Sequence, residues 1–381
     1  MKKLLLFIFV LIVLSQNVFS QKDTAQTKQE FIPSGKLWGN VFVDYTDKIQ
    51  SNTFNMSNTQ YASTPKDFTM FDFRRVYLGY DYEISERFST QFLLSYEGQT
   101  TSDGSRTVYL KAANIKYKGI YKNADLVVGQ MQTPTFSTVS DPTWGYRSLE
   151  RTLLDMRKIG VSYDMGVSLQ GKFTNKGDCG YTLMIGNGSG AKPENDKFKK
   201  EYIDIWAKFM HQKIIVDIGG DNEISQLSPY KKYKTTLKCF AAYQTPGFTF
   251  GLEVFSQLQK NNTLLTEPFP SAMKDTVNAI SSGISVFAKG AINQKVGWVL
   301  RYDHFNPDNK FNVKNVYAAS YPSFFTESFV LAGIDFTVIK NIHIIPNVWL
   351  DSYNNRDVAF NHLSKNSYDL TARITGTYLF K

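Results

Sequence analysis

The last fifteen residues of the chain, SYDLTARITGTYLFK (367–381), alternate between two kinds of side chain. One alternate set is apolar with aromatic residues at both ends, and comprises Tyr368, Leu370, Ala372, Ile374, Gly376, Tyr378 and Phe380. The other set is largely polar, and comprises Asp369, Thr371, Arg373, Thr375, Thr377 and Leu379. Successive side chains of a β-strand point to opposite faces, so the pattern predicts a strand with one apolar and one polar face. Aromatic residues at both ends of the apolar face are typical of a strand that crosses a lipid bilayer.

The same alternation recurs along most of the chain. In 247–259, Phe248 and Phe250 share one face, whereas Thr249 and Glu253 share the other. Most of the expected strands reach the length of about 9–11 residues that crosses a bilayer. We expect sixteen strands, at 36–47, 70–84, 87–97, 107–118, 124–133, 162–174, 178–187, 201–211, 213–220, 232–244, 247–259, 278–290, 294–305, 327–339, 341–352 and 367–381. The polar faces carry Gly, Thr, Ser, Asp and Arg, as a water-filled lumen would permit.

The connections between these expected strands alternate in length. The long ones include 48–66, 134–161 and 306–326, and tight turns such as 85–86 and 121–123 lie between long ones. Short periplasmic turns and longer external loops are typical of an outer-membrane barrel. The alternative, a soluble β-sandwich, has no reason to sort its loops in this way. The sequence therefore predicts a 16-stranded antiparallel transmembrane β-barrel whose last strand pairs with the first, so that no strand edge is left unpaired in lipid.

The first twenty residues have the pattern of a secretory signal peptide. Two lysines precede an apolar run at 4–14, and Ser20 is a small residue suited to cleavage. The run is too short for a transmembrane helix, which needs about 20 residues. We predict a signal peptide at 1–20, a periplasmic lead at 21–35 and the transmembrane barrel at 36–381, with the protein located in the bacterial outer membrane.

The composition narrows the range of partners. The chain has 43 Lys and Arg residues against 34 Asp and Glu residues, a formal net charge of +9. Nucleic acid is not expected as a partner outside the cytoplasm, so the basic excess favours anions or the acidic groups of lipopolysaccharide. Two cysteines are too few for a disulfide-stapled domain, and the four histidines lack the spacing of metal ligands. We expect no cofactor and no metal ion.

The longest connection, 134–161, is the candidate for a constriction that folds into the pore. Its basic residues are Arg147, Arg151, Arg157 and Lys158, and its acidic residues include Asp141, Glu150 and Asp155. We expect its middle, SLERTLLDMRK (148–158), to form a short helix capped by Ser148. Such a helix would place Arg147, Arg151 and Lys158 on one side, and charges at a constriction determine which ions pass.

Further charged residues have the strand parity that faces the lumen. The cations are Arg75, Lys208, Arg301 and Arg373, and the anions are Asp204, Glu253, Asp303, Asp335 and Asp351. Two interpretations stay open: the arginines guide anions, because a guanidinium suits oxyanions and stays charged, or they pair with carboxylates and stiffen the wall. The candidate residues for constriction and anion guidance are Arg147, Arg151, Arg157, Lys158, Arg75, Arg301 and Arg373. The mixed signs argue against a strongly phosphate-selective pore.

Several stretches resemble the phosphate-selective porin O/P family. They are ADLVVGQMQTPTF (124–136), WGYRSLERTLLD (144–155), KIGVSYDMGVSLQGKF (158–173) and FDFRRVYLGYDYEIS (71–85). In that family a strand ending in Gly-Gln-x-x-x-Pro enters the third external loop. The terminal strand, with its near-final Phe380, is similar to the sorting signal read by the barrel assembly machinery. The resemblance implies a sixteen-stranded porin, usually trimeric, with the third loop folded into the pore.

These patterns predict a passive diffusion channel for small hydrophilic solutes with a weak anion preference. The expected partners are small hydrophilic or anionic solutes, outer-membrane lipid and lipopolysaccharide, the barrel assembly machinery and two further copies of the chain. The alternative is a barrel scaffold or adhesin subunit of an outer-membrane complex with a closed lumen. An enzyme is not expected, because no arrangement of serine and histidine stands out as a nucleophile with its base.

Overall fold

A computed structural model describes residues 31–52, 61, 64–228, 231–263, 276–312, 324–356 and 365–381. The chain divides into two units, residues 1–32 and residues 33–381, and the second unit is the barrel. The predicted signal peptide and most of the predicted periplasmic lead lie outside the described residues. Within the described part of the chain, no helix is long and apolar enough to span a membrane.

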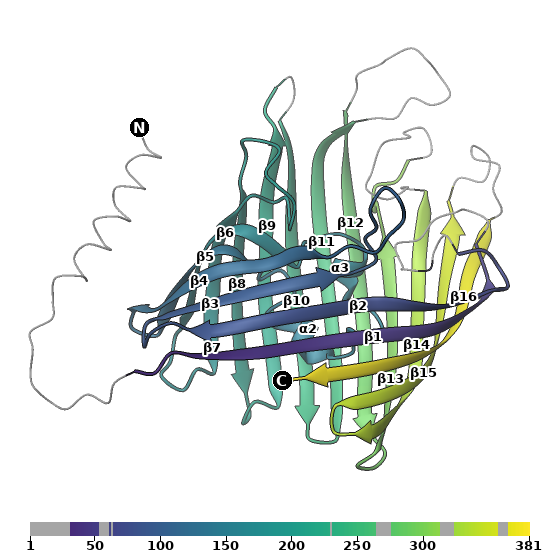
Figure 1. The fold of residues 1–381 in the computed structure, drawn as a ribbon. Helices are drawn as coiled ribbons and strands as arrows, with labels where there is room; N and C mark the ends of the chain where they lie inside the picture. The colour runs from purple at the N-terminus through teal and green to yellow at the C-terminus, as the bar shows by residue number, and fades with distance from the viewer. Residues whose placement is uncertain are drawn as a thin grey trace, which may run out of the picture. The chain divides into compact units, whose positions relative to one another are not determined.

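Sixteen strands form one closed, entirely antiparallel barrel (Figure 1). In chain order they are β1 (Ser34–Gln50), β2 (Phe68–Glu83), β3 (Phe88–Tyr96), β4 (Tyr109–Tyr121), β5 (Ala124–Gln132), β6 (Tyr163–Lys172), β7 (Cys179–Gly186), β8 (Lys200–Phe209), β9 (Ile214–Gln226), β10 (Lys232–Thr245), β11 (Phe248–Thr263), β12 (Thr276–Ala291), β13 (Val296–Asn306), β14 (Phe325–Ile339), β15 (Ile342–Asn355) and β16 (Asn366–Phe380). Each strand pairs with its neighbours in sequence, and β1 pairs with β16. The predicted fold class and the predicted closure of the barrel are confirmed.

One expected strand differs clearly in length from the observed one. The strand expected at 213–220 extends in β9 to Gln226, because the residues after Gly220 still pair with both neighbouring strands. The polar stretch that follows Gly220 suggested a loop. In the structure Asp221 faces the interior and forms an ion pair with Lys200 of β8, N–O 3.2 Å, so the polar residues belong to the wall.

Strand ends define two ends of the barrel. At one end, called here the short-turn end, consecutive strands are joined by 84–87, 122–123, 173–178, 210–213, 246–247, 292–295 and 340–341. At the opposite end, called the long-loop end, most connections are longer, including 133–162 between β5 and β6, and the exception is 227–231 between β9 and β10. The chain enters β1 and leaves β16 at the short-turn end (Figure 1).

The outer face of the barrel carries exposed apolar side chains. On β16, Tyr368, Ile374 and Tyr378 are exposed, whereas Asp369 and Arg373 on the other face are buried. Other strands present exposed outward residues in the same way, among them Val167, Ile185, Ile203, Ile205, Ile218, Leu300 and Phe336. An exposed apolar surface of this extent is stable in lipid and not in water, so the outer face is the membrane-facing surface.

The inner face is not uniformly polar, and the expectation of a polar, water-filled lumen is corrected here. Strands β9 to β15 direct large apolar side chains inward, and these are buried: Ile215, Phe240, Phe287, Val299, Phe329, Leu331, Ile345 and Trp349. They pack against residues of the segment 133–162, including Trp144, Leu149 and Met156. Apolar residues are stable in the interior because this segment covers them and removes them from water.

Candidate functional site

The segment between β5 and β6, residues 133–162, lies inside the barrel. It contains two short helices, α2 (Ser140–Trp144) and α3 (Leu153–Met156), which Figure 1 shows surrounded by the strands. Its side chains reach several strands of the wall: Thr135 contacts Asp221 of β9, and Tyr146 contacts Asp335 of β14. The segment therefore occupies part of the interior of the barrel.

The single helix predicted over 148–158 with Ser148 as its cap is wrong. The structure has α2 before this range and α3 at its end, and Thr152 stands at the N-cap of α3 without a side-chain cap bond. Gly145 ends α2 with a left-handed backbone, φ 70°, a conformation that glycine adopts without strain. Arg147, Arg151 and Lys158 consequently do not share one helix face.

Three arginines of the wall explain why the chain between the helices is not helical. Arg75 of β2 donates to the carbonyl oxygen of Arg147 at 2.9 Å, and Arg373 of β16 donates to that of Leu149 at 3.1 Å. Arg301 of β13 donates to the carbonyl oxygen of Arg151. These alternate carbonyl groups point toward the wall, where charged donors satisfy them in place of a helical ladder.

Buried ion pairs hold the same segment from other directions. Arg74 of β2 pairs with Glu150, N–O 2.8 Å, and both side chains are fully buried. Arg157 pairs with Glu327 of β14 at 2.6 Å. Burial alone would raise the pKa of Glu150, but Arg74, followed by Arg151 and Arg75, outweighs burial and holds that pKa well below its usual range. Glu150 is therefore an anion at every ordinary pH, as its pairing with Arg74 requires.

Trp144, at the end of α2, is the main apolar contact of the segment with the wall. Its ring centre lies 5.0 Å from that of Phe287 on β12, with the two ring planes at 66°, and the guanidinium of Arg301 lies 5.1 Å from the Trp144 ring centre. Its indole N–H donates to the carbonyl oxygen of Glu150 at 2.7 Å. The apolar contact and the hydrogen bond together keep α2 against β12 and β13.

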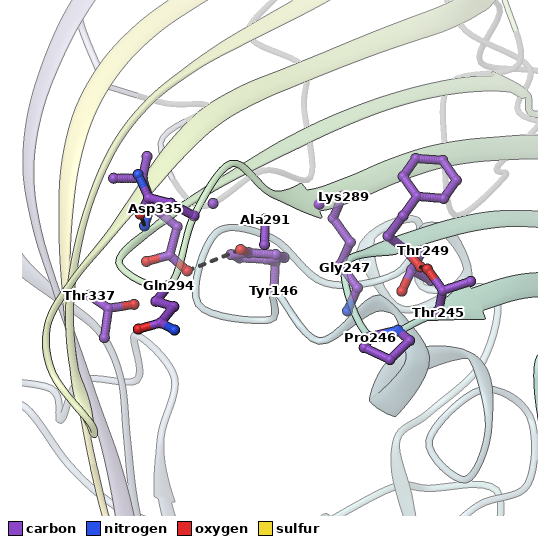
Figure 2. Close-up of a pocket in the computed structure, with 15 residues that line it drawn as sticks. Tyr146, Thr245, Pro246, Gly247, Thr249, Lys289, Ala291, Gln294, Asp335 and Thr337 are labelled. Atoms are coloured by element: carbon purple, nitrogen blue, oxygen red, sulfur yellow. Dashed lines mark hydrogen bonds between the residues drawn. The ribbon is translucent and has the colours of Figure 1, made fainter.

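A cavity of about 290 Å³ lies beside this contact, near the short turns 246–247 and 292–295. Figure 2 shows Tyr146 directed at Asp335 of β14, with Lys289 on the opposite side. The Tyr146 hydroxyl donates to Asp335 at 3.0 Å, and the Lys289 ammonium donates to the carbonyl oxygen of Trp144 at 2.9 Å. His343 of β15 contacts the other oxygen of Asp335 at 2.8 Å. The cavity thus belongs to the contact between the internal segment and the wall.

Replacing Tyr146 with Phe tests this contact. The substitution removes one hydrogen bond, but Asp335 retains His343 as a partner. We expect the free energy of unfolding to fall by about 1 kcal/mol, the net value of a typical hydrogen bond. Urea unfolding of the refolded barrel in detergent measures the change, and a loss of more than about 3 kcal/mol would mean that Asp335 depends on Tyr146 alone.

The segment also presents partly exposed charges, which we name the constriction cluster: Asp141, Arg147, Arg151 and Asp155. Arg147 forms ion pairs with Asp141 at 3.1 Å and with Asp155 at 2.8 Å. The side chains of Arg147 and Arg151 are 17% and 19% exposed, whereas the ion pairs that hold the segment are buried. Burial alone would lower the pKa of Arg147, but Asp141 and then Asp155 raise it well above its ordinary value, so Arg147 stays charged.

The wall near Arg147 carries a second charged pair. The Nε atom of Arg147 lies 3.4 Å from the hydroxyl oxygen of Tyr77 on β2, and this hydroxyl donates to Glu97 at 2.7 Å. Lys111 of β4 forms an ion pair with Glu97. Burial by itself would raise the pKa of Glu97, but Lys111, Arg75 and Arg147 lower it well below its ordinary value. Cations and anions therefore alternate between the cluster and β2 to β4.

The seven residues predicted from sequence do not form one ring of charge. Four of them are buried and contact the internal segment or wall carboxylates: Arg75, Arg157, Arg301 and Arg373. Arg147 and Arg151 belong to the constriction cluster. Lys158 is exposed just after α3, with a left-handed φ of 55°. Arg301 also pairs with Asp303 at 2.5 Å, and Arg373 pairs with Asp44 at 3.0 Å. For these two arginines the structure shows the second of the two interpretations above, pairing with carboxylates of the wall.

Five charged residues of the interior were not predicted from the sequence: Arg74, Glu97, Lys111 and two lysines near the short turns, Lys116 and Lys172. Arg74 lies where the β1–β2 register shifts, between the pairs Phe42–Arg75 and Val43–Phe73. At this irregularity two neighbouring residues, Arg74 and Arg75, are both buried, so simple alternation does not predict Arg74 as an interior residue. The sequence did contain a signal by which Lys116 and Lys172 could have been found. Each lies on the lumen-facing set of a strand that runs toward a short turn, as the recognised Lys208 does.

A second cavity, of about 670 Å³, lies at the short-turn end beneath the start of the internal segment. The wall contributes Lys116, Asp125, Gln170, Lys172, Thr182, Trp206, Lys208 and Gln244, and the segment contributes Thr138, Val139, Pro142 and Thr143. Asn123 and Asn175 of two neighbouring turns border the cavity and are joined by a hydrogen bond of 2.9 Å. The cavity is polar on the side of the wall.

Comparison with solved structures identifies the fold. The outer membrane channel DcaP of Acinetobacter baumannii matches with a TM-score of 0.66 and 14% identity, over 94% of this chain and 100% of that chain. The barrel has the fold of the outer-membrane porins. OprB of Pseudomonas putida matches with a TM-score of 0.59 and 9% identity, over 91% of this chain and 94% of that chain.

The anion-selective porin of Comamonas acidovorans also matches, with a TM-score of 0.56 and 10% identity, over 92% of this chain and 100% of that chain. At these identities the likeness concerns the fold and not the solute. No protein-family model matches the sequence, and no match to a curated protein was found. The resemblance to the phosphate-selective O/P family thus rests on the sequence stretches alone.

Proposed function

We propose that this protein is a bacterial outer-membrane porin, a passive channel for small hydrophilic solutes with a weak anion preference, narrowed by the internal segment 133–162. The observation that carries the proposal is the placement of this segment inside a closed sixteen-stranded barrel. A barrel of this size is too wide for its own side chains to fill, so the segment and its charges determine what passes.

The apolar contacts support a passage that runs along one side of the barrel. Trp144, Leu149 and Met156 occupy the space along β9 to β15 together with the inward apolar side chains of those strands. The partly exposed charges of the constriction cluster face β2 to β4, where Glu97 and Lys111 lie. A solute would therefore pass between the cluster and the polar wall formed by the first half of the barrel.

The balance of charge along this passage supports a weak preference. Near the cluster, the cations Arg147, Arg151 and Lys111 face the anions Asp141, Asp155 and Glu97 in equal number. The exposed Lys158 adds one positive charge. Nearly balanced charges discriminate weakly between small ions, and the excess of one sign determines the direction of the preference.

We also propose how the protein assembles. It forms a homotrimer in the outer membrane, contacts lipopolysaccharide and is inserted by the barrel assembly machinery. One solved structure of this fold, of the Vibrio cholerae outer membrane protein OmpT, is described as a trimer form. The stretches within 124–173 relate the chain to the phosphate-selective O/P family in this proposal, without a phosphate selectivity.

Replacing Arg147 and Arg151 with Ala tests the selectivity. The carbonyl oxygens that hold the segment remain, so the segment keeps its position while Asp141 and Asp155 lose their counter-charges. We expect the reversal potential in a planar bilayer under a salt gradient to move toward cations, with a severalfold change in the permeability ratio. The measurement compares the wild-type chain with the double variant.

The matched control is Lys199→Ala, which breaks an ion pair with Glu194 in the exposed connection between β7 and β8. This variant should keep the wild-type reversal potential. An unchanged potential in the double variant, with a folded barrel shown by its resistance to urea, would exclude the constriction cluster as the origin of the selectivity.

A second function is favoured by the packed interior: a barrel with a closed lumen that serves as a scaffold or adhesin. The observation for it is that apolar side chains and buried ion pairs fill the side of β9 to β15. The same bilayer measurement separates the two functions, because a correctly folded closed barrel gives no conductance steps.

A further inference from the structure

The 670 Å³ cavity at the short-turn end has an aromatic side chain that lies against its wall. Trp206 of β8 is paired in register with Gly180 of β7. A Cβ atom on Gly180 would lie 2.7 and 2.9 Å from two atoms of the Trp206 ring, so the ring crosses the place where another residue would carry its side chain. The indole is half-buried and borders the cavity. Part of its surface therefore packs on β7, and part faces the space inside the barrel.

The lining of the cavity has an apolar side around this ring. Ile215 of β9 and two residues of the internal segment, Val139 and Pro142, border the cavity together with Trp206. Trp206 also packs against the apolar cluster that contains Val139 and Ile215. Burial of apolar area favours a ligand with an apolar surface of its own, whereas a hydrated ion gains nothing from this side.

A row of polar side chains runs beside the apolar side. Asp125 of β5 is paired in register with Gln170 of β6, and Gln170 is paired with Thr182 of β7. All three border the cavity, and paired residues on neighbouring strands have their Cβ atoms about 4.5–5.5 Å apart. Thr182 lies two residues along β7 from Gly180, so the row is about 7 Å from the level of Trp206. Together the three side chains provide a carboxylate, an amide and a hydroxyl, which both accept and donate hydrogen bonds.

We infer that this cavity binds a saccharide, with a pyranose ring on Trp206 and its hydroxyl groups bonded to Asp125, Gln170 and Thr182. A pyranose of the β-glucose type has hydroxyl groups around its edge and C–H groups on its faces, and such C–H groups are attracted to the negative face of an aromatic ring. The cavity volume of 670 Å³ lies within the range of about 300–1,000 Å³ of small-molecule sites. The inference rests on the proposed function for the route by which the saccharide reaches the cavity.

The lysines that border the cavity are compatible with an uncharged ligand. An ammonium group donates hydrogen bonds to hydroxyl oxygens as well as to anions. The Lys208 ammonium lies over the Trp206 ring, 5.8 Å from its centre, and its flexible side chain can donate to a hydroxyl group of a bound sugar. An inorganic anion would use the lysines and leave Trp206 and Ile215 without a contact. A saccharide uses both sides of the lining.

The first measurement is a calorimetric titration of the full chain, refolded in detergent, with cellobiose as the probe. We expect saturable binding, and the affinity should be the same at low and at high salt because cellobiose carries no charge. In W206L the affinity should fall by about tenfold, and in Q170L it should fall severalfold. Leucine keeps an apolar side chain beside Ile215, and resistance to urea shows that each variant is folded.

The matched control is W298L. Trp298 of β13 alternates with the buried Val299 and Arg301 and shares the outer face with the exposed Leu300. This variant should bind cellobiose as the wild type does. An equal loss of affinity in W206L and W298L, or absence of binding to the wild type, would overturn the inference. Adenosine is the competing probe, because its flat base also stacks on an indole, and tighter binding of adenosine than of cellobiose would overturn the saccharide as the ligand.

Ion current separates this inference from the proposed function. With wild-type channels, cellobiose should reduce the conductance reversibly, and the reduction should weaken in W206L and persist in W298L. A conducting wild type that does not bind cellobiose refutes the saccharide site and leaves the channel intact. A wild type that binds cellobiose through Trp206 without conducting supports the site and refutes the channel.

Discussion

Glu150→Ala is expected to release the internal segment and to raise the conductance of the channel severalfold. The substitution removes the nearer carboxylate partner of Arg74, whose side chain is fully buried in the wall, and leaves Asp44 at 3.9 Å as the remaining carboxylate. A buried charge that loses its partner costs about 3–5 kcal/mol, and the cheapest relief is to move the segment and admit water. Single-channel recording should show larger and noisier steps, and urea unfolding should show the lower stability.

The control for this prediction is Glu194→Ala, which removes an acidic residue from an exposed ion pair with Lys199. An exposed pair contributes little, so this variant should match the wild type in conductance and in stability. If Glu150→Ala keeps the wild-type conductance, the three arginine–carbonyl bonds hold the segment without help from the ion pair.

The pH dependence of the same contact follows from the low pKa of Glu150. Its pKa in the folded state lies below the unfolded value of about 4.3, so its contribution is present above that pH and is lost only as the pH falls through the folded value. The channel should therefore keep a constant conductance level from neutral pH down to about pH 4. A rise in conductance between neutral pH and pH 5 would contradict this assignment.

Lys238→Met is expected to destabilise the wall by about 3–5 kcal/mol, because it leaves two buried carboxylates without their cation. The Lys238 ammonium lies 2.8 Å from Asp204 of β8 and 2.6 Å from Asp217 of β9, and all three side chains are fully buried. Methionine keeps most of the length of the side chain and removes its charge. Urea unfolding of the refolded barrel in detergent measures the loss.

Two further variants make this prediction specific. Lys234→Met changes a lysine on the same face of the same strand for which the described residues provide no ion pair, and it should be close to neutral. Asp204→Asn and Asp217→Asn, added to Lys238→Met, remove the unpaired charges and should restore most of the stability. A stable Lys238→Met barrel would mean that water reaches the two carboxylates.

Alternation in the sequence was sufficient to predict the strands, and the lengths of the connections supported their order. The reason is local: a strand that separates lipid from an interior must alternate its side chains, so Tyr368, Ile374 and Tyr378 could be assigned to the outer face directly. The same rule failed for the interior. Phe240, Phe287 and Phe329 occupy inward positions, and their burial depends on a segment that lies far away in sequence.

The candidate site was only partly predictable for a related reason. The sequence identified the segment 134–161 and its basic residues, because a long connection rich in charge is a natural constriction. It did not predict two short helices, since the helix pattern of 148–158 competes with hydrogen bonds from Arg75, Arg301 and Arg373. Those donors come from three different strands, and no local pattern shows that they meet.

By itself the sequence determined a closed antiparallel barrel of sixteen strands with an apolar outer face, because strand periodicity is a property of neighbouring residues. Only the tertiary structure decided which charges hold the internal segment and which remain partly exposed. Arg301 and Arg373 have the same residue type and strand parity as a pore-lining arginine would have, yet both are buried against carbonyl oxygens of the segment. Their environment depends on contacts between distant parts of the chain, and that environment sets what a charge can do.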